Sequence, residues 1–455
     1  MELSSAQWLQ MNIAAVIAVL AFLLVYFVPT KWVVITLILI IPFQIIGSRY
    51  GSLTIYLIYL IAFVWVLRTQ FRELPFLGYV GFIFFSYALA LSQVPSVTLQ
   101  DHLLYLFLVG SDFLVFYIVY NYFRQNRDVK HFLYLFLILN GLVLLYSVAQ
   151  IVVGLDESSP FVGGEIGLRP AREDGRLSGP FKTVGLTAEY MVIGVFITGY
   201  ALWMLKLSQV IRLLLIFMIM GNFSMMIATG NRGGIFTLVA GCLLFLFLFR
   251  KEMGARGVLL SLVGAGIAFA VSSIVVINYT DFNKLFDRLA ETEIEEGIPD
   301  TRSKTWPQTL EHISSKPILG HGPQLKFSDN TYMRPGAPQP VLWPHNLYLF
   351  LLYTLGIIGF IAYLAFLMRI TWSFYDGSRT PRETLVEDGF ARLAIIVMAL
   401  FLIDQIKVEF LRSESTEYQH FIFMIWGALT ALTNKEIRDT GNSSNGVIRR
   451  TTHKG

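Results

Sequence analysis

Cysteine and charge are both scarce in this chain, and each shortage restricts what the protein can be. Its 455 residues include a single cysteine, Cys242, which excludes an intrachain disulfide and a metal site built from several thiolates. Charged residues make up 15% of the sequence, against about 25% in soluble proteins. Because 55% of the residues are hydrophobic, more than a soluble core needs, part of the surface must face lipid.

Signals of several other protein classes are also missing. The net charge of +4 is small, and no basic stripe with interleaved aromatic residues indicates nucleic-acid binding. Residues 1–12 contain no lysine or arginine, unlike the start of a cleavable signal peptide, and no internal repeat is evident. No Asp-x-Asp sequence occurs, and the spacings of His312, His321 and His345 match no short metal-ligand motif. We therefore expect no metal and no cofactor.

Long apolar runs predict an all-α, polytopic integral membrane protein with about 12 to 13 transmembrane helices, since a bilayer core requires about 20 apolar residues. The predicted spans are 12–29, 32–47, 52–67, 76–93, 103–122, 131–153, 184–204, 211–229, 234–249, 257–277, 346–370, 389–408 and 416–433. The apolar pattern leaves open whether residues 1–50 form two spans or one hairpin.

Lysine and arginine gather in alternate short loops, which the positive-inside rule places in the cytoplasm. The two longest polar segments then lie on the outer side, where near-helical spacing in the second predicts short surface helices at 281–291 and 301–315. The chain is thus divided into membrane helices (1–153), a first outer loop (154–183), membrane helices (184–277), a large outer loop (278–345), membrane helices (346–433) and a cytoplasmic tail (434–455).

Ionisable residues inside apolar runs are candidate functional groups. For Asp404 we favour an ion pair with Lys407, and for Asp112 structural pairing or hydrogen bonding. For Glu189 a structural and a functional role are equally favoured. Arg232 differs, because the surrounding glycines in TGNRGG allow its backbone to approach a ligand, so we favour a substrate role over a turn with a snorkelling arginine.

A histidine and an amide precede the apolar run in PHNLYLFLLYTLGIIG (344–359). A titratable group at a membrane surface, roofed by a large loop, indicates chemistry on a substrate that is half lipid and half water-soluble. For Gly356 and Gly359 we favour close helix packing over room for a lipid chain. We interpret His312 as an exposed residue of an amphipathic helix and His321 as a structural residue in a glycine turn.

Five segments together resemble the O-antigen ligase and polymerase superfamily of bacterial membrane glycosyltransferases. They are RLSGPF (176–181), TGNRGG (229–234), DTRSKTW (300–306), PILGHG (317–322) and HNLYLFLLYTLGIIG (345–359), the last fitting a signature of His-Asn, nine residues and Gly-x-x-Gly. The resemblance covers roughly 170–435. Two features depart from the family: about twelve spans are usual there, and KTVGLTAE follows Phe181 where many members carry an Asn-Pro-Asn-like stretch.

The resemblance implies a GT-C-like fold in the bacterial inner membrane, with the active site facing the periplasm. It implies metal-independent, inverting transfer of a saccharide from undecaprenyl diphosphate to a sugar hydroxyl during lipopolysaccharide or exopolysaccharide assembly. The acceptor is lipid A-core in ligases and a lipid-linked repeat unit in polymerases. The alternative is a transporter or flippase of lipid-linked or anionic solutes that uses Asp112, Glu189 and Asp404, although no inverted repeat supports it.

The residues suit the reaction that the resemblance implies. Arginine holds phosphate oxygens with a planar, permanently charged fork, so we assign Arg232 and Arg302 to the diphosphate leaving group. Histidine accepts protons near neutral pH, so we assign His345 as the general base. We expect further substrate contacts from Arg176 (sugar or phosphate), Asn346 (orientation of the histidine ring or sugar), Arg288 (acceptor path) and Glu189 (developing oxocarbenium charge).

Overall fold

The computed structural model describes the chain over most of its length. The described residues are 20–43, 47–48, 51–96, 99–153, 175–181, 183–280, 282, 284–290, 294–295, 298–299, 301–323, 344–380, 385–411 and 415–434. Most of the first outer loop and the tail beyond residue 434 therefore lie outside the described residues.

Helices account for nearly all of the described structure. They are α2 (Thr30–Ile40), α3 (Leu53–Leu67), α4 (Leu77–Leu91), α5 (Leu99–Asn126), α6 (Val129–Val153), α7 (Val184–Met204), α8 (Gln209–Ala228), α9 (Arg232–Tyr279), α10 (Lys284–Ala290), α11 (Thr301–Ser315), α12 (Leu347–Arg379), α13 (Leu385–Asp404) and α14 (Thr416–Thr433), with a 3-10 turn at Gly179–Phe181. Two small antiparallel ladders pair β1 (Gly47–Ser48) with β2 (Gly51–Ser52) and β3 (Ile294–Glu295) with β4 (Ile298–Pro299).

The helices confirm an all-α, multi-pass membrane protein. Within the described residues, six helices are long and apolar enough to cross a bilayer, and α3 and α4 are shorter apolar helices. The segment Leu20–Phe27 and α2 are bent by 118° at the break between them and make a seventh candidate if they form one span. The predicted span 389–408 extends too far, because α13 ends at Asp404.

Helix α9 contains two predicted spans rather than one. Its 48 residues would extend about 72 Å if straight, yet Arg232 at its start bonds to Arg288, nine residues beyond its end. The chain reverses at Gly254, whose φ of 62° and ψ of 174° are not helical. The predicted spans 234–249 and 257–277 are thus the two arms of a helical hairpin.

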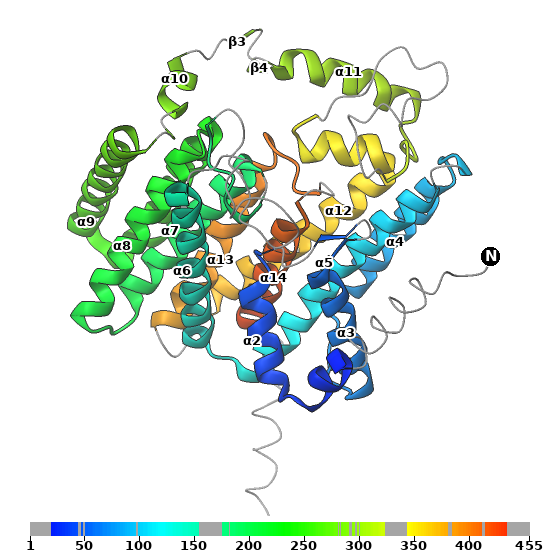
Figure 1. Cartoon of the computed structure of the whole chain (residues 1–455), viewed down its shortest axis with the longest axis horizontal. Coiled ribbons are helices and arrows are strands. Elements are labelled where there is room, and N and C mark those ends of the chain that lie inside the picture. Colours follow the sequence, from blue (N-terminus) through cyan, green and yellow to red (C-terminus); the bar gives the residue numbers. More distant parts are fainter. Residues whose placement is uncertain are drawn as a thin grey trace, which may run out of the picture.

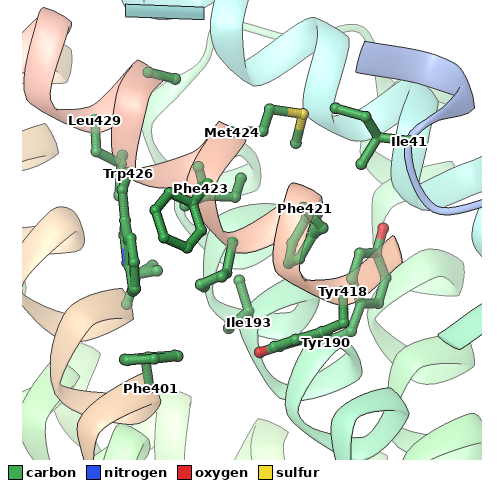
Figure 2. Close-up of a cluster of buried hydrophobic side chains, with 14 of the residues drawn as sticks. Ile41, Tyr190, Ile193, Phe401, Tyr418, Phe421, Phe423, Met424, Trp426 and Leu429 are labelled. Atoms are coloured by element: carbon green, nitrogen blue, oxygen red, sulfur yellow. The ribbon is translucent and has the colours of Figure 1, made fainter. Parts of the chain in front are cut away.

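Helix α14 lies at the centre of the bundle, packed against α5 and surrounded by other helices (Figure 1). All of its residues are buried. Aromatic side chains fill this centre, where the ring of Trp426 lies 4.8 Å from that of Phe401 and 5.0 Å from that of Phe423 (Figure 2). Because α14 does not face lipid, it can carry polar residues such as His420.

Two of the ionisable residues inside apolar runs are paired as favoured from the sequence. Asp112 is fully buried, and its Oδ1 lies 3.5 Å from Nε2 of His420, which also contacts the Ser111 hydroxyl at 2.7 Å. Asp404 forms an ion pair with Lys407 and accepts a 2.8 Å hydrogen bond from the Thr237 hydroxyl. A buried carboxylate requires such compensation.

A layer formed by α10, the β3–β4 ladder and α11 covers one end of the bundle (top of Figure 1). Helices α10 and α11 confirm the short helices predicted at 281–291 and 301–315. This layer brings residues of the large loop over the ends of the membrane helices, where the chemically reactive side chains gather.

Candidate active site

The turn between α8 and α9 places Arg232 at the covered end of the bundle. Gly230 has a φ of +60°, which a side chain rarely adopts, and the Asn231 carboxamide accepts a hydrogen bond from Gly234 N at 3.3 Å to begin α9. The Arg176 side chain covers this turn, since a Cβ added to Gly230 would lie 2.8 Å from Arg176 Cδ. Two of the predicted arginines therefore meet here.

Helix α10 brings a third arginine to the same turn. Arg232 Nη1 donates to the carbonyl of Arg288 at 2.9 Å, and Arg288 Nη1 donates to the carbonyl of Gly230 at 3.4 Å. These reciprocal bonds hold two guanidinium groups side by side. Such a concentration of positive charge favours an anion.

Arg302, in the first turn of α11, extends the positive charge toward α13. Its Nη2 donates to the carbonyl of Lys407 at 2.8 Å. Burial lowers the pKa of Arg302, the nearby Glu409 raises it, and Arg232 lowers it again. Its Nε is buried without a hydrogen-bond partner among the described residues, so this cation keeps a donor for a ligand.

His345 is fixed at the start of α12 by contacts on both sides. Trp306 of α11 donates its indole N–H to the carbonyl of Pro344 at 2.8 Å. The Asn346 amide oxygen accepts from the backbone N–H groups of Tyr348 and Leu349, and its Nδ2 donates to the carbonyl of Ile406 at 3.0 Å. The structure thus places Asn346 as the N-cap of α12, with its amide bonded to the backbone. His345 has a φ of 48°, a strained value for a residue with a side chain.

Glu409 stands behind His345 and is a site residue that sequence reasoning missed. Its Oε1 lies 3.9 Å from His345 Nδ1, and its side chain is completely buried, whereas that of His345 is 41% exposed. The span predicted from the sequence ends at residue 408, and Glu409 has no predicted role. The signal that could have found it is the density of charge after the apolar run, at Asp404, Lys407, Glu409 and Arg412.

Lys407 also belongs to the site, although the sequence predicts it only as the ion-pair partner of Asp404. Its side chain lies directly on Gly233, where an added Cβ would overlap Lys407 Cδ, and its ammonium group pairs with Asp404. The glycine beside Arg232 therefore makes room for another cation. The glycines of TGNRGG have two roles: Gly230 allows the turn, and Gly233 allows the Lys407 side chain to come close.

Glu189 lies beneath the arginines, fully buried in α7. Its Oε2 accepts a 3.1 Å hydrogen bond from Gln405, whose own amide oxygen accepts from Phe410 N at 2.9 Å. It is also within electrostatic reach of Asp404 and Lys407. This carboxylate thus supports the turn that follows α13 and does not face the open side of the site.

The 404–409 segment, which follows the apolar run of α13, is the common element of the site. It contacts Glu189 through Gln405, Asn346 through Ile406, Arg302 through Lys407 and His345 through Glu409. Three parts of the chain, α7, α11 and the start of α12, thus meet on one short turn. The structure brings the predicted residues into one region, with Asn346 and Glu189 bonded to this turn.

An apolar cavity of about 750 Å³ lies between α7, α8 and the two arms of α9. Its lining includes Phe196, Trp203, Phe223, Phe245 and Val271. The arms of α9 that form its walls end at Arg232 and, through α10, at Arg288. Its lining in the first arm starts at Cys242, about 15 Å along the helix from Arg232, and continues toward the turn at Gly254, so the cavity lies deeper in the bundle than the arginines.

Fold and site define a multi-pass membrane protein with a cationic, histidine-containing site at one end of its helix bundle. Residues 213–364 match the family model described as O-antigen ligase. This match covers about a third of the chain, confirms the predicted resemblance to the O-antigen ligase and polymerase superfamily, and supports a glycosyltransferase-type enzyme acting on a lipid-linked saccharide and an acceptor. No curated protein matches the chain. The match includes Arg232, Arg288, Arg302, His345 and Asn346, whereas Arg176, Glu189 and Glu409 lie outside it.

Proposed function

We propose that the protein is a metal-independent, inverting glycosyltransferase that moves a saccharide from undecaprenyl diphosphate to a sugar hydroxyl, as an O-antigen ligase or a repeat-unit polymerase. One observation carries the proposal: Arg302 and a histidine backed by a buried carboxylate meet at the 404–409 segment, and Arg232, bonded to Arg288, lies next to Gly233, which packs against Lys407. We place this site at the periplasmic face of the bacterial inner membrane. The acceptor is lipid A-core or a lipid-linked repeat unit.

The arginines stabilise the leaving group. As the glycosidic bond breaks, its electron pair passes to the diphosphate oxygen, and negative charge develops there. Arg232 and Arg302 are held by backbone carbonyls, so they need little rearrangement to meet this charge. In a partly buried site each donor is more effective than in water. Arg288 positions Arg232 and lines the acceptor path, and Arg176 binds the sugar or a phosphate.

His345 accepts the proton of the attacking hydroxyl. Glu409 faces Nδ1, which favours the tautomer with a proton on Nδ1 and leaves Nε2 to accept from the sugar. The new bond joins the acceptor oxygen to the anomeric carbon as the bond to the phosphate oxygen breaks. Attack opposite the leaving group inverts the anomeric centre. Asn346 acts by fixing the chain at His345, and Glu189 by supporting the turn that carries Glu409.

The apolar cavity between α7, α8 and α9 suits the distal part of a long hydrocarbon chain on the donor. Its walls are mostly aliphatic and aromatic, and the lining residue of the first α9 arm nearest to the arginines, Cys242, lies about 15 Å along the helix from Arg232. An amphiphile with an anionic head and a long apolar tail satisfies both regions. This complementarity also favours a lipid-linked donor over a soluble nucleotide sugar.

Purified protein in detergent, incubated with an undecaprenyl-diphosphate oligosaccharide, tests the proposal. A ladder of products without further addition identifies a polymerase, and a single product that requires lipid A-core identifies a ligase. If no product forms with any acceptor while the donor still binds, the transferase proposal fails and transport of the donor becomes the better explanation.

Glu409→Gln is expected to lower kcat by about 10- to 100-fold, because replacing the carboxylate that faces His345 Nδ1 weakens the control of the histidine tautomer. The KM for the donor should change little, since Glu409 lies behind His345. Steady-state kinetics at several pH values measures both effects. An unchanged kcat and pH profile would remove Glu409 from the mechanism. Glu387→Gln, in the first turn of α13, provides the control.

Removal of divalent ions by a chelator is expected to leave the rate unchanged. The charge of the departing diphosphate is met by guanidinium groups, which require no metal. Transfer is measured with EDTA and after adding back Mg²⁺ or Mn²⁺. Strong inhibition that is reversed by one of these ions would overturn the metal-independent mechanism.

A further inference from the structure

Helix α12 is broken at Gly356, and a segment of the large loop fills the break. Gly356 has a φ of 63° and a ψ of −167°, which separate residues 347–355 from 357–379. Ile357 N donates to the carbonyl of Pro317 at 2.9 Å. His321 N and Gly322 N donate to the carbonyls of Tyr353 and Thr354 at 2.8 and 2.9 Å. Residues 317–322 thus satisfy backbone groups that the break exposes, as a membrane helix requires.

The contact between the 317–322 segment and the break in α12 leaves no room for a side chain at Gly320 or at Gly356. A Cβ on Gly320 would lie 2.5 Å from Gly356 N and from the carbonyl oxygen of Thr354, and a Cβ on Gly356 would overlap the carbonyl of Ile318. Gly320 also has a φ of +68°. The prediction of helix packing at Gly356 is therefore wrong, because its close neighbour is the 317–322 segment. Backbone cannot move aside as a flexible side chain can.

The 317–322 segment is also tied to α11, which it follows. The His321 ring stacks on Tyr353 of α12, with centroids 4.6 Å apart and planes at 17°. Its Nε2 lies 2.9 Å from the carbonyl oxygen of His312 in α11. The end of α11 is thereby fixed to the break in α12, which confirms the structural role expected for His321.

Helix α11 is therefore attached to α12 at both ends. At its start, Trp306 bonds to Pro344 beside His345, and Arg302 bonds to Lys407. At its end, the 317–322 segment occupies the break at Gly356. We propose that this second attachment sets the position of Arg302 relative to His345, and that Gly320 and Gly356 are positioning residues for the transfer. This inference rests on the proposed function for its kinetic readout only.

Distances between spin labels on the two helices test the inference in the full-length protein. Cys242 is replaced by serine, and labels are attached through Leu310→Cys in α11 and Ile361→Cys in α12, whose side chains are 52% and 50% exposed. We expect one narrow distance distribution in the parent. Gly356→Ala and Gly320→Ala should each broaden or shift it and lower kcat by about 100-fold, the cost of a misplacement near 1 Å.

Two further measurements separate positioning from general damage. In an Arg302→Lys background, Gly356→Ala should add less than about threefold to the loss, because both changes act on the same geometry. Gly78→Ala in α4, where an added Cβ meets nothing within 4 Å, should leave distances and rate unchanged.

An unchanged distance distribution in both glycine variants would overturn the inference, as would full activity with altered distances. The inference would also be overturned if the loss of kcat in the double variant equalled the product of the losses in Gly356→Ala and Arg302→Lys alone. If the parent itself transfers no saccharide, the proposed function fails, whereas the distance measurement, made without substrate, still decides whether the segment fixes α11.

Discussion

His345→Ala is expected to lower kcat by about 10²- to 10⁴-fold, the usual contribution of a positioned general base. Without the imidazole, the acceptor hydroxyl has no group at this position to take its proton as the new bond forms. The protein should still accumulate in the membrane, because the His345 side chain is 41% exposed and the fold around it depends on Asn346 and Trp306. Product formation per amount of purified protein measures the effect.

His131→Ala is the matched control. This histidine, on α6, bonds to Tyr122 and is separate from the 404–409 segment, so its loss should leave transfer intact. Turnover by His345→Ala within a few-fold of the parent would contradict the proposed base. If that variant instead no longer bound the donor, His345 would have a role in donor binding rather than in proton transfer.

Arg302→Ala is expected to lower kcat by about 10²- to 10³-fold, the range found when one preorganised donor to a developing anion is removed. The variant also loses the bond to the Lys407 carbonyl, which connects α11 to the turn after α13. Single-turnover rates at saturating donor separate this loss from weaker binding. Arg302→Lys should retain part of the rate, because the charge remains but the planar fork is lost.

Arg250→Ala serves as the control, because it also removes one positive charge from a helix but lies outside the site. Its guanidinium lies 4.4 Å from the Phe247 ring centroid, at the end of the first α9 arm opposite to Arg232, so transfer should be unchanged. Equal activity of Arg302→Ala and the parent would show that the diphosphate is held elsewhere. An equal loss in both arginine variants would indicate a general effect of charge on the fold.

Most of the fold follows from hydrophobic length, because a bilayer forces each spanning segment to satisfy its own backbone. Residue runs such as 131–153 and 184–204 therefore coincide with α6 and α7. The sequence also reveals two arms inside α9, since charged residues such as Arg250 and Lys251 interrupt its apolar run. Helix α14 was predictable for the same reason, although its complete burial was not.

The candidate site was predictable in its residue types and only partly in its contacts. Arginines in glycine turns and a histidine before an apolar run are local signals, so Arg232 and His345 could be selected without coordinates. The contacts that organise them are not local. Glu409 meets His345 across 64 positions of sequence, and no periodicity connects the two. The break at Gly356 is equally hidden, because the apolar run continues through it.

The order of assembly follows from where the common turn lies in the chain. Glu189, Arg232, Arg302 and His345 all precede the 404–409 segment, which contacts Glu189, Arg302 and His345 and packs against Gly233 beside Arg232. Chains are synthesised from the N-terminus, so a ribosome-bound intermediate that has inserted α7 to α12 carries every predicted catalytic residue without the turn that orders them. We expect such an incomplete chain to be inactive. It should therefore not consume the lipid-linked donor until Glu409 has been translated.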